Sequence, residues 1–208
     1  MKNLKDIIVE RLHINKDTGN HYNYHPKTKD ELKQLVDKLI EERGDDADLN
    51  DIDTSEITDM SIMFENSKFN GDISNWDVSN VKNMKFMFSF SEFTGENGDI
   101  SNWNVSNVKE MSWMFRESKF NGDISKWDVS NVKNMKCMFF NSNFNGDISQ
   151  WNVSKVEDMG TMFQYSEFTG ENGDISKWDV SNVKNMYHMF YGSPLEKNIP
   201  KWYKEYIK

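Results

Sequence analysis

The chain has 208 residues, with 34 acidic side chains against 25 Lys and Arg, and a formal net charge of −9. This length accommodates one domain with a core or one capped repeat array, and the negative charge argues against a basic face that neutralises nucleic-acid phosphates. No apolar run approaches the roughly 20 residues needed to cross a bilayer. The single cysteine, Cys137, excludes an internal disulfide and fits a reducing compartment. The sequence therefore predicts no nucleic-acid partner and no membrane span.

Residues 1–27 are interpreted as an N-terminal extension. A short amphipathic helix is predicted from four apolar residues at helical spacing, Leu4, Ile7, Ile8 and Leu12. The turn signal at residues 17–19 and the aromatic–polar alternation after it indicate a loop or a short hairpin. Charged Glu10 and Arg11 interrupt the apolar start, which is not typical of a secretory signal. A cytoplasmic location is expected for the chain as given, or the cell surface if an export segment has been removed.

Residues 28–48 are predicted to form a capping helix and a linker. Thr28 and Glu31 have the spacing of a capping box, in which each side chain satisfies an unpaired amide at the helix start. Five apolar residues make one stripe along this helix: Leu32, Leu35, Val36, Leu39 and Ile40. Gly44 stands where a left-handed cap ends a helix. One apolar face and one charged face suit a lid over the open end of a repeat array.

The middle of the chain repeats one phrase five times, beginning with GDISNWDVSNVKNM. The copies start at Gly71, Gly98, Gly122, Gly146 and Gly173, at intervals of 27, 24, 24 and 27 residues. A shift of 24 residues aligns 49–70 with the first copy, so six coils are predicted over 49–198. Trp202 lies 24 residues after Trp178, which predicts that a seventh coil begins inside a C-terminal cap, 199–208.

Within each coil, Ile73, Trp76 and Val78 have the spacing of a leucine-rich repeat. The pattern predicts a short strand over 75–79 and then a short helix, because Val81 and later apolar residues recur at helical spacing. The fold class predicted is α/β: a leucine-rich-repeat-like solenoid with short parallel strands and short helices, capped by an N-terminal helix. The recurring Trp and Met-Phe positions are expected in its core.

The phrase GDISxWDVSNVxNMxxMF and the lead-in PKTKDELKQLVDKLIEERGDDADLNDIDTSEITDM resemble the BspA-like leucine-rich repeat proteins of bacteria. The resemblance covers residues 26–202. It implies a leucine-rich-repeat-like solenoid with a binding role, usually at the cell surface, and it brings no catalytic residues. Similar repeats also occur in phage and mobile-element proteins.

One outward position of the predicted strand is a candidate partner-binding surface. Its members are Asp53, Asp77, Asn104, Asp128, Asn152 and Asp179, which we call the outer ladder. From the second coil onward Asp and Asn alternate, so each carboxylate has an amide neighbour that can donate a hydrogen bond. Two interpretations remain open. The ladder has only a structural role, in which amides separate stacked carboxylates, or it has this role and also binds a partner on a concave face. Two three-residue insertions are predicted to protrude as an edge contact through Thr94, Glu96, Thr169 and Glu171.

Residues 45–65 contain eight acidic residues and no basic residue. The acidic patch at their start comprises Asp45, Asp46, Asp48 and Asp51. An EF-hand needs Gly at its sixth and Glu at its twelfth position, but counting from Asp46 these are Asp51 and Ile57. No metal site is therefore predicted. The acidic patch is interpreted as a solvated edge or as a face for a basic partner, and a looser calcium site is the alternative.

The sequence contains no Ser/His/Asp arrangement and no Gly-rich phosphate loop. Cys137 stands at a position where other coils hold Phe86, Trp113, Thr161 and His188, so we do not expect a nucleophile there. We expect no enzyme and no cofactor, but a non-catalytic protein–protein interaction module with a protein partner of unknown identity. The alternatives are an exported adhesin of the BspA type and a phage or mobile-element inhibitor that binds a basic host protein through residues 45–65.

Overall fold

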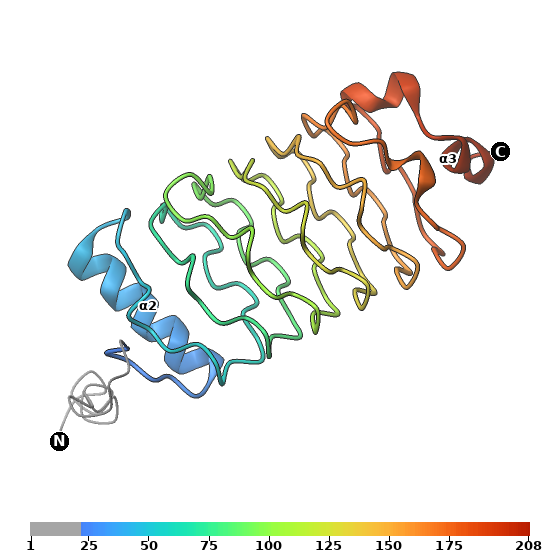
Figure 1. The fold of residues 1–208 in the computed structure, drawn as a ribbon. Coiled ribbons are helices and arrows are strands. Elements are labelled where there is room, and N and C mark those ends of the chain that lie inside the picture. Colours follow the sequence, from blue (N-terminus) through green and yellow to red (C-terminus); the bar gives the residue numbers. More distant parts are fainter. Residues whose placement is uncertain (1–21) are drawn as a thin grey trace.

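A computed structural model describes residues 22–208 as an elongated stack of coils (Figure 1). The helix α2 (Lys29–Arg43) lies at one end and α3 (Lys201–Tyr206) at the other. Two 3₁₀ helices, η1 (Ile175–Lys177) and η2 (Pro194–Asn198), belong to the last coil. We number the six predicted repeats as coils 1 to 6, with bounds 49–70, 71–97, 98–121, 122–145, 146–172 and 173–198. The helix predicted near the N-terminus falls in residues 1–21, outside the described residues.

The predicted α/β fold with parallel strands and a helix in every coil is wrong. Within residues 22–208 there is no β-strand, and neighbouring coils are joined by isolated parallel bridges. The two α-helices of this part of the chain lie outside coils 1–6. The longest file of bridges runs through Asp59, Asn83, Glu110, Asn134, Asp158 and Asn185.

The segment predicted as a strand, 75–79, forms no strand, since Asn75 and Ser79 lie in turns. Its side chains alternate as expected, since Trp76 and Val78 are buried and Asp77 is exposed. Two of its backbone amides bond within the coil, since the Trp76 N–H donates to the Ile73 carbonyl and the Ser79 N–H to the Asp77 carboxylate. The Asn75 N–H donates to the Asn50 side chain of the preceding coil. Side chains make the bonds to the preceding coil instead. Alternation alone therefore predicted the burial correctly and the backbone pairing wrongly.

The segment predicted as a helix consists of consecutive turns. Phe86 and Phe90 have φ of 58° and 55°, and the equivalent residues of the other coils are also left-handed, which a right-handed helix excludes. Alternate backbone amides donate hydrogen bonds to carbonyls of the next coil. The Phe86 N–H donates to the Ser112 carbonyl at 3.1 Å and the Phe88 N–H to the Met114 carbonyl at 2.9 Å. The amides between them donate to the carbonyl three residues earlier in the same coil. The turns still bury Met84, Met87 and Phe88 because they place these side chains on the inner side.

The core is a continuous stack of aromatic rings and methionines, as the sequence predicts. Phe88 stacks on Phe64 and on Phe115, with ring centroids 5.4 and 5.5 Å apart. Each buried tryptophan donates its indole N–H to a carbonyl of the preceding coil, as Trp127 does to Ile100 at 3.0 Å. Burying an indole is costly unless this donor is satisfied, so the bond also fixes the register between coils.

Helix α2 lies at one end of the stack, and its buried leucines belong to the common core (Figure 1). The Thr28 side chain accepts from the Glu31 N–H at 3.2 Å, while Glu31 accepts from the Lys27 N–H at 2.7 Å. The reciprocal bond of the capping box thus goes one residue earlier than expected. Gly44 ends the helix with φ of 93°, a conformation that favours glycine, and its N–H donates to Ile40.

The last turn of the stack is closed by aromatic residues. The Trp202 indole stacks on Trp178 and donates to the Ile175 carbonyl at 3.1 Å, as each tryptophan of the coils donates to the coil before it. Tyr203 on α3 packs edge-on against Phe190, which it shields from solvent.

Candidate functional site

The outer ladder lies on the surface, but its side chains have a local role. Asp53 is half-buried and the other five members are exposed. Each accepts a hydrogen bond from the amide two residues later, as Asp128 does from Ser130 at 3.0 Å. Hydrogen bonds from the Ser130 hydroxyl and amide lower the pKa of Asp128 below its ordinary value. The predicted amide-to-carboxylate bonds between coils are not formed in this ladder.

Those bonds occur in a different column, the file of bridges described above, which we call the acid–amide column. Its members alternate between acid and amide in every coil: Asp59, Asn83, Glu110, Asn134, Asp158 and Asn185. Each amide donates to the acid of the preceding coil, as Asn134 does to Glu110 at 3.1 Å. All members are half-buried. The predicted amide-to-carboxylate stacking is therefore wrong for the outer ladder and is found in the column where the backbones of successive coils form bridges.

The two insertions are held by the same set of bonds. Thr94 accepts from the Glu96 amide and donates its own amide to the Asn70 side chain. Thr169 repeats this with Glu171 and Asn145. Their threonines are half-buried and the glutamates are exposed. The insertions are therefore held to the stack by their threonines, and the side chains of Glu96 and Glu171 are the groups that a partner could contact.

The acidic patch is divided by its contacts. Asp45, Asp46 and Asp48 are exposed, whereas Asp51 accepts two bonds of 2.9 Å from Arg43 on α2. Burial raises the pKa of Asp51, but the hydrogen bonds from Arg43 and Asn23 outweigh burial and bring it below its ordinary value. Asp51 therefore ties the lid to the first coil, and three carboxylates remain for a partner. Within residues 22–208, no group of three His, Cys, Asp or Glu is arranged to hold a metal.

An Arg43→Met variant is expected to unfold with a free energy about 1 kcal/mol lower at pH 7. Because the Asp51 pKa is lowered in the folded state, its contribution is present above about pH 3.9 and is lost as pH falls through the folded pKa. The deficit should vanish near pH 2 in urea titrations. Lys38→Met, which removes the exposed pair with Glu42, is the matched control and should change little. Equal losses in both variants would contradict a lid held by Arg43.

A second surface follows the left-handed turns and is aromatic. We call it the aromatic stripe, and its members are Phe86, Phe90, Trp113, Phe140, Tyr165, Tyr187 and Tyr191. Phe86 stacks on Trp113 at 5.6 Å, and Phe140, Tyr165 and Tyr191 follow in edge-on contacts of 5.9 and 5.5 Å. Four members are exposed and three are half-buried. A contiguous exposed apolar patch on a polar surface is typical of an interaction site.

Arg116 fills the centre of this stripe. Its guanidinium lies over the rings of Phe90, Trp113 and Phe140, at 4.4, 5.0 and 5.7 Å from their centroids. It also pairs with Glu117 at 3.0 Å, while its buried Nε has no hydrogen-bond partner. Cation–π contacts on three rings hold the side chain in place. Rings from three successive coils are thereby joined into one surface.

Sequence reasoning missed the stripe although its signal was present. The positions of Phe86 and Trp113 were recognised as variable and were judged only as sites for a nucleophile. Cys137, in the same column, is buried and contacts the Thr161 hydroxyl at 2.7 Å. Burial raises the pKa of this thiol. The signal was that several of these variable positions hold large apolar side chains. Such side chains on an otherwise polar surface indicate an interaction site.

Comparison with known proteins identifies the repeat but no activity. A family profile described as "Mycoplasma protein of unknown function, DUF285" matches residues 31–143 and again 89–202. No curated protein and no solved structure matches the chain. Among residues 22–208, no helix has the length and apolar character to cross a bilayer. The expectation of a recurrent bacterial repeat is confirmed at this coarser level, and the BspA assignment itself stays a prediction.

Proposed function

From the premise that this chain belongs to the DUF285 family, whose description assigns no function, we propose that it is a non-catalytic module that binds another protein. The observation that supports the proposal is the aromatic stripe. The buried Phe, Met and Trp columns repeat almost without change, whereas the stripe differs from coil to coil. A regular scaffold that varies in its large exposed side chains is suited to recognition of one particular partner surface.

The proposal makes the stripe the main contact and the outer ladder a secondary one. Ladder carboxylates already accept local bonds and lie in water, where a surface ion pair contributes about 1 kcal/mol or less. Aromatic side chains contribute more to interfaces because they bury large areas with few rotatable bonds. Phe90 is 38 % exposed and Tyr165 is 49 % exposed, so much of each ring is still open to a partner.

A photo-crosslinking amino acid at position 90 or 165, introduced into the protein in its native host, is expected to join it to one discrete protein. The same amino acid at position 75, on the ladder side, is the matched control and should give a weaker product or none. Phe90→Ser together with Tyr165→Ser should abolish crosslinking from a third stripe position, 140. Equal products from positions 75 and 90, or none from any position, would refute the proposal.

The inhibitor interpretation uses a different surface and is tested in the same experiment. Asp45, Asp46 and Asp48 are exposed directly after α2, which lies at the end of the stack opposite α3 (Figure 1). A basic partner bound there would crosslink from position 46, and the product would be lost at high salt. The adhesin interpretation differs in location and is tested by fractionation of the native cells.

A further inference from the structure

Three exposed lysines stand four positions before the first left-handed residue of coils 2, 3 and 4. Lys82, Lys109 and Lys133, which we call the lysine file, occupy the same position in successive coils. Their backbones are bonded directly, since the Lys109 amide donates to Lys82 and the Lys133 amide to Lys109, both at 2.9 Å. All three side chains are exposed. Like charges are therefore stacked at the close spacing of neighbouring coils.

No carboxylate of the described residues lies within 4.0 Å of the ammonium groups of this file. The same column in coils 5 and 6 is different, because Glu157 pairs with Lys184 there. Lys133 is near enough to Glu157 for its charge to act on that carboxyl. Stacked like charges are unfavourable, and an anionic ligand would remove the repulsion in coils 2 to 4.

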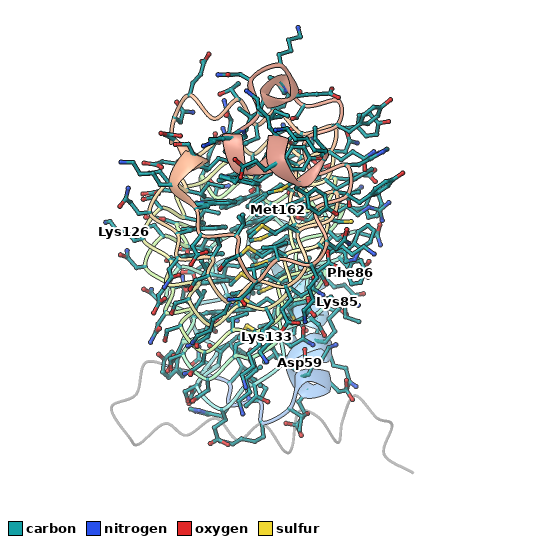
Figure 2. The ribbon with its side chains drawn as sticks, turned by 90° about the vertical axis from the view of Figure 1, so that its right-hand side faces the viewer. Asp59, Lys85, Phe86, Lys126, Lys133 and Met162 are labelled. Carbon is teal, nitrogen blue, oxygen red and sulfur yellow. The ribbon has the colours of Figure 1, made fainter. Side chains whose placement is uncertain are left out.

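The surface around the file is basic although the chain is acidic. From the lysine file to the second left-handed residue of each coil, coils 2 to 4 carry six basic side chains, Lys82, Lys85, Lys109, Arg116, Lys133 and Lys136, against two acidic ones, Glu110 and Glu117. Glu117 is paired with Arg116. Glu110 accepts bonds from Asn134 and from the Ser112 amide. Figure 2 shows Lys85 and Phe86 on the side of the stack opposite Lys126, with Met162 of the core between them.

We propose that the lysine file, together with the Phe90, Trp113 and Phe140 rings of the same three coils, binds an extended acidic polypeptide segment of the partner protein. This inference rests on the proposed function and names the chemistry of its partner. Alternate residues of an extended chain are about 6.6 Å apart. Stacked core rings of successive coils are 5.4 to 6.5 Å apart. Carboxylates at every second position would thus reach successive lysines, whose flexible stems absorb the small mismatch.

Two features favour an acidic peptide over a nucleic acid. Acidic residues flank the basic surface along the stack, with Glu65 in coil 1 and Glu157 in coil 5, so a polyanion longer than three coils would be repelled. The ring of Trp113 is already stacked on Phe86 and covered by Arg116. Base stacking needs an open ring face, whereas an aliphatic side chain can pack on ring edges.

The test measures binding of a labelled ten-residue peptide that alternates Glu and Leu, by fluorescence anisotropy at about 50 mM salt. We expect saturable binding that weakens about tenfold or more in the triple variant Lys82→Gln, Lys109→Gln and Lys133→Gln, and similarly at about 300 mM salt. Lys126→Gln with Lys177→Gln removes exposed lysines from the ladder side and should leave the affinity unchanged. Circular dichroism and thermal melts confirm that all variants fold.

Two further probes make the inference refutable. A peptide with Gln in place of Glu should bind at least about tenfold more weakly, and equal binding would overturn recognition by charge. A ten-nucleotide oligo-dT that bound more tightly than the peptide, through the same lysines, would overturn the assignment to protein. Absence of peptide binding with intact crosslinking from position 90 would refute this inference and leave the proposed function standing.

Discussion

A Phe115→Ala variant is expected to lose about 3 to 5 kcal/mol of unfolding free energy, the largest effect of any single substitution considered. The Phe115 ring is fully buried and stacks on Phe88 in one neighbouring coil and on Phe139 in the other, at 5.5 and 5.7 Å. It also stacks on Phe120 in its own coil at 4.2 Å. The cavity left behind would therefore weaken both interfaces of coil 3 at once.

Urea titration followed by tryptophan fluorescence measures this loss. In a stack where each coil contacts only its neighbours, weakening two interfaces also reduces cooperativity, so we expect a broader transition for Phe115→Ala. Phe90→Ala is the control, because Phe90 is of the same residue type but is 38 % exposed, and a loss of about 1 kcal/mol is expected. Similar losses for the two variants would mean that the ring stack is not the main source of stability.

The core of the stack was predictable because its residues recur in phase. Shifting the sequence by one repeat places Trp76 on Trp103 and Phe88 on Phe115, and both columns are buried. Helix α2 was also predictable, since a cap, an apolar stripe and a terminal glycine agree along residues 28–44. In both places several independent signals favoured the same local structure.

The backbone of the coils was not predictable from the same pattern. Buried residues at the spacing of Met84, Met87 and Phe88 fit a helix, but consecutive turns with bonds to the next coil bury them equally well. Left-handed residues are usually signalled by Gly or Asn, as at Asn66 and Asn141. The first left-handed position of each coil instead holds residues such as Phe86 and Thr161, which gave no such signal.

The candidate surfaces were predictable in part. Alternation of Asp and Asn drew attention to the outer ladder, yet the acid–amide column alternates more strictly and through all six coils. Only the structure separates the two, because it shows which column has backbones joined by bridges. The stripe and the lysine file were overlooked since each was judged one residue at a time. Their significance comes from stacking, which brings equivalent positions of successive coils into contact.

An Asn134→Asp variant tests whether the acid–amide column stabilises the stack, and we expect it to lose about 2 to 4 kcal/mol at pH 7. The change removes a donor to Glu110 and places three carboxylates, at positions 110, 134 and 158, in successive coils. Two charges about 5 Å apart at an effective dielectric constant near 20 repel by ~3 kcal/mol. Asn152→Asp is the control, because it adds a carboxylate to the exposed outer ladder, where less than about 1 kcal/mol is expected.

The pH dependence of the Asn134→Asp variant identifies the cause of its instability. The repulsion raises the folded-state pKa of the introduced carboxyl above its unfolded value of about 3.9. Stability is then fully present below that value and is lost as pH rises through the raised pKa. Urea titrations should therefore show the deficit at pH 7 shrinking toward pH 4, while the Asn152→Asp control stays flat. A deficit that is equal at both pH values would attribute the loss to the missing hydrogen bond alone, and equal losses in both variants would contradict a stabilising column.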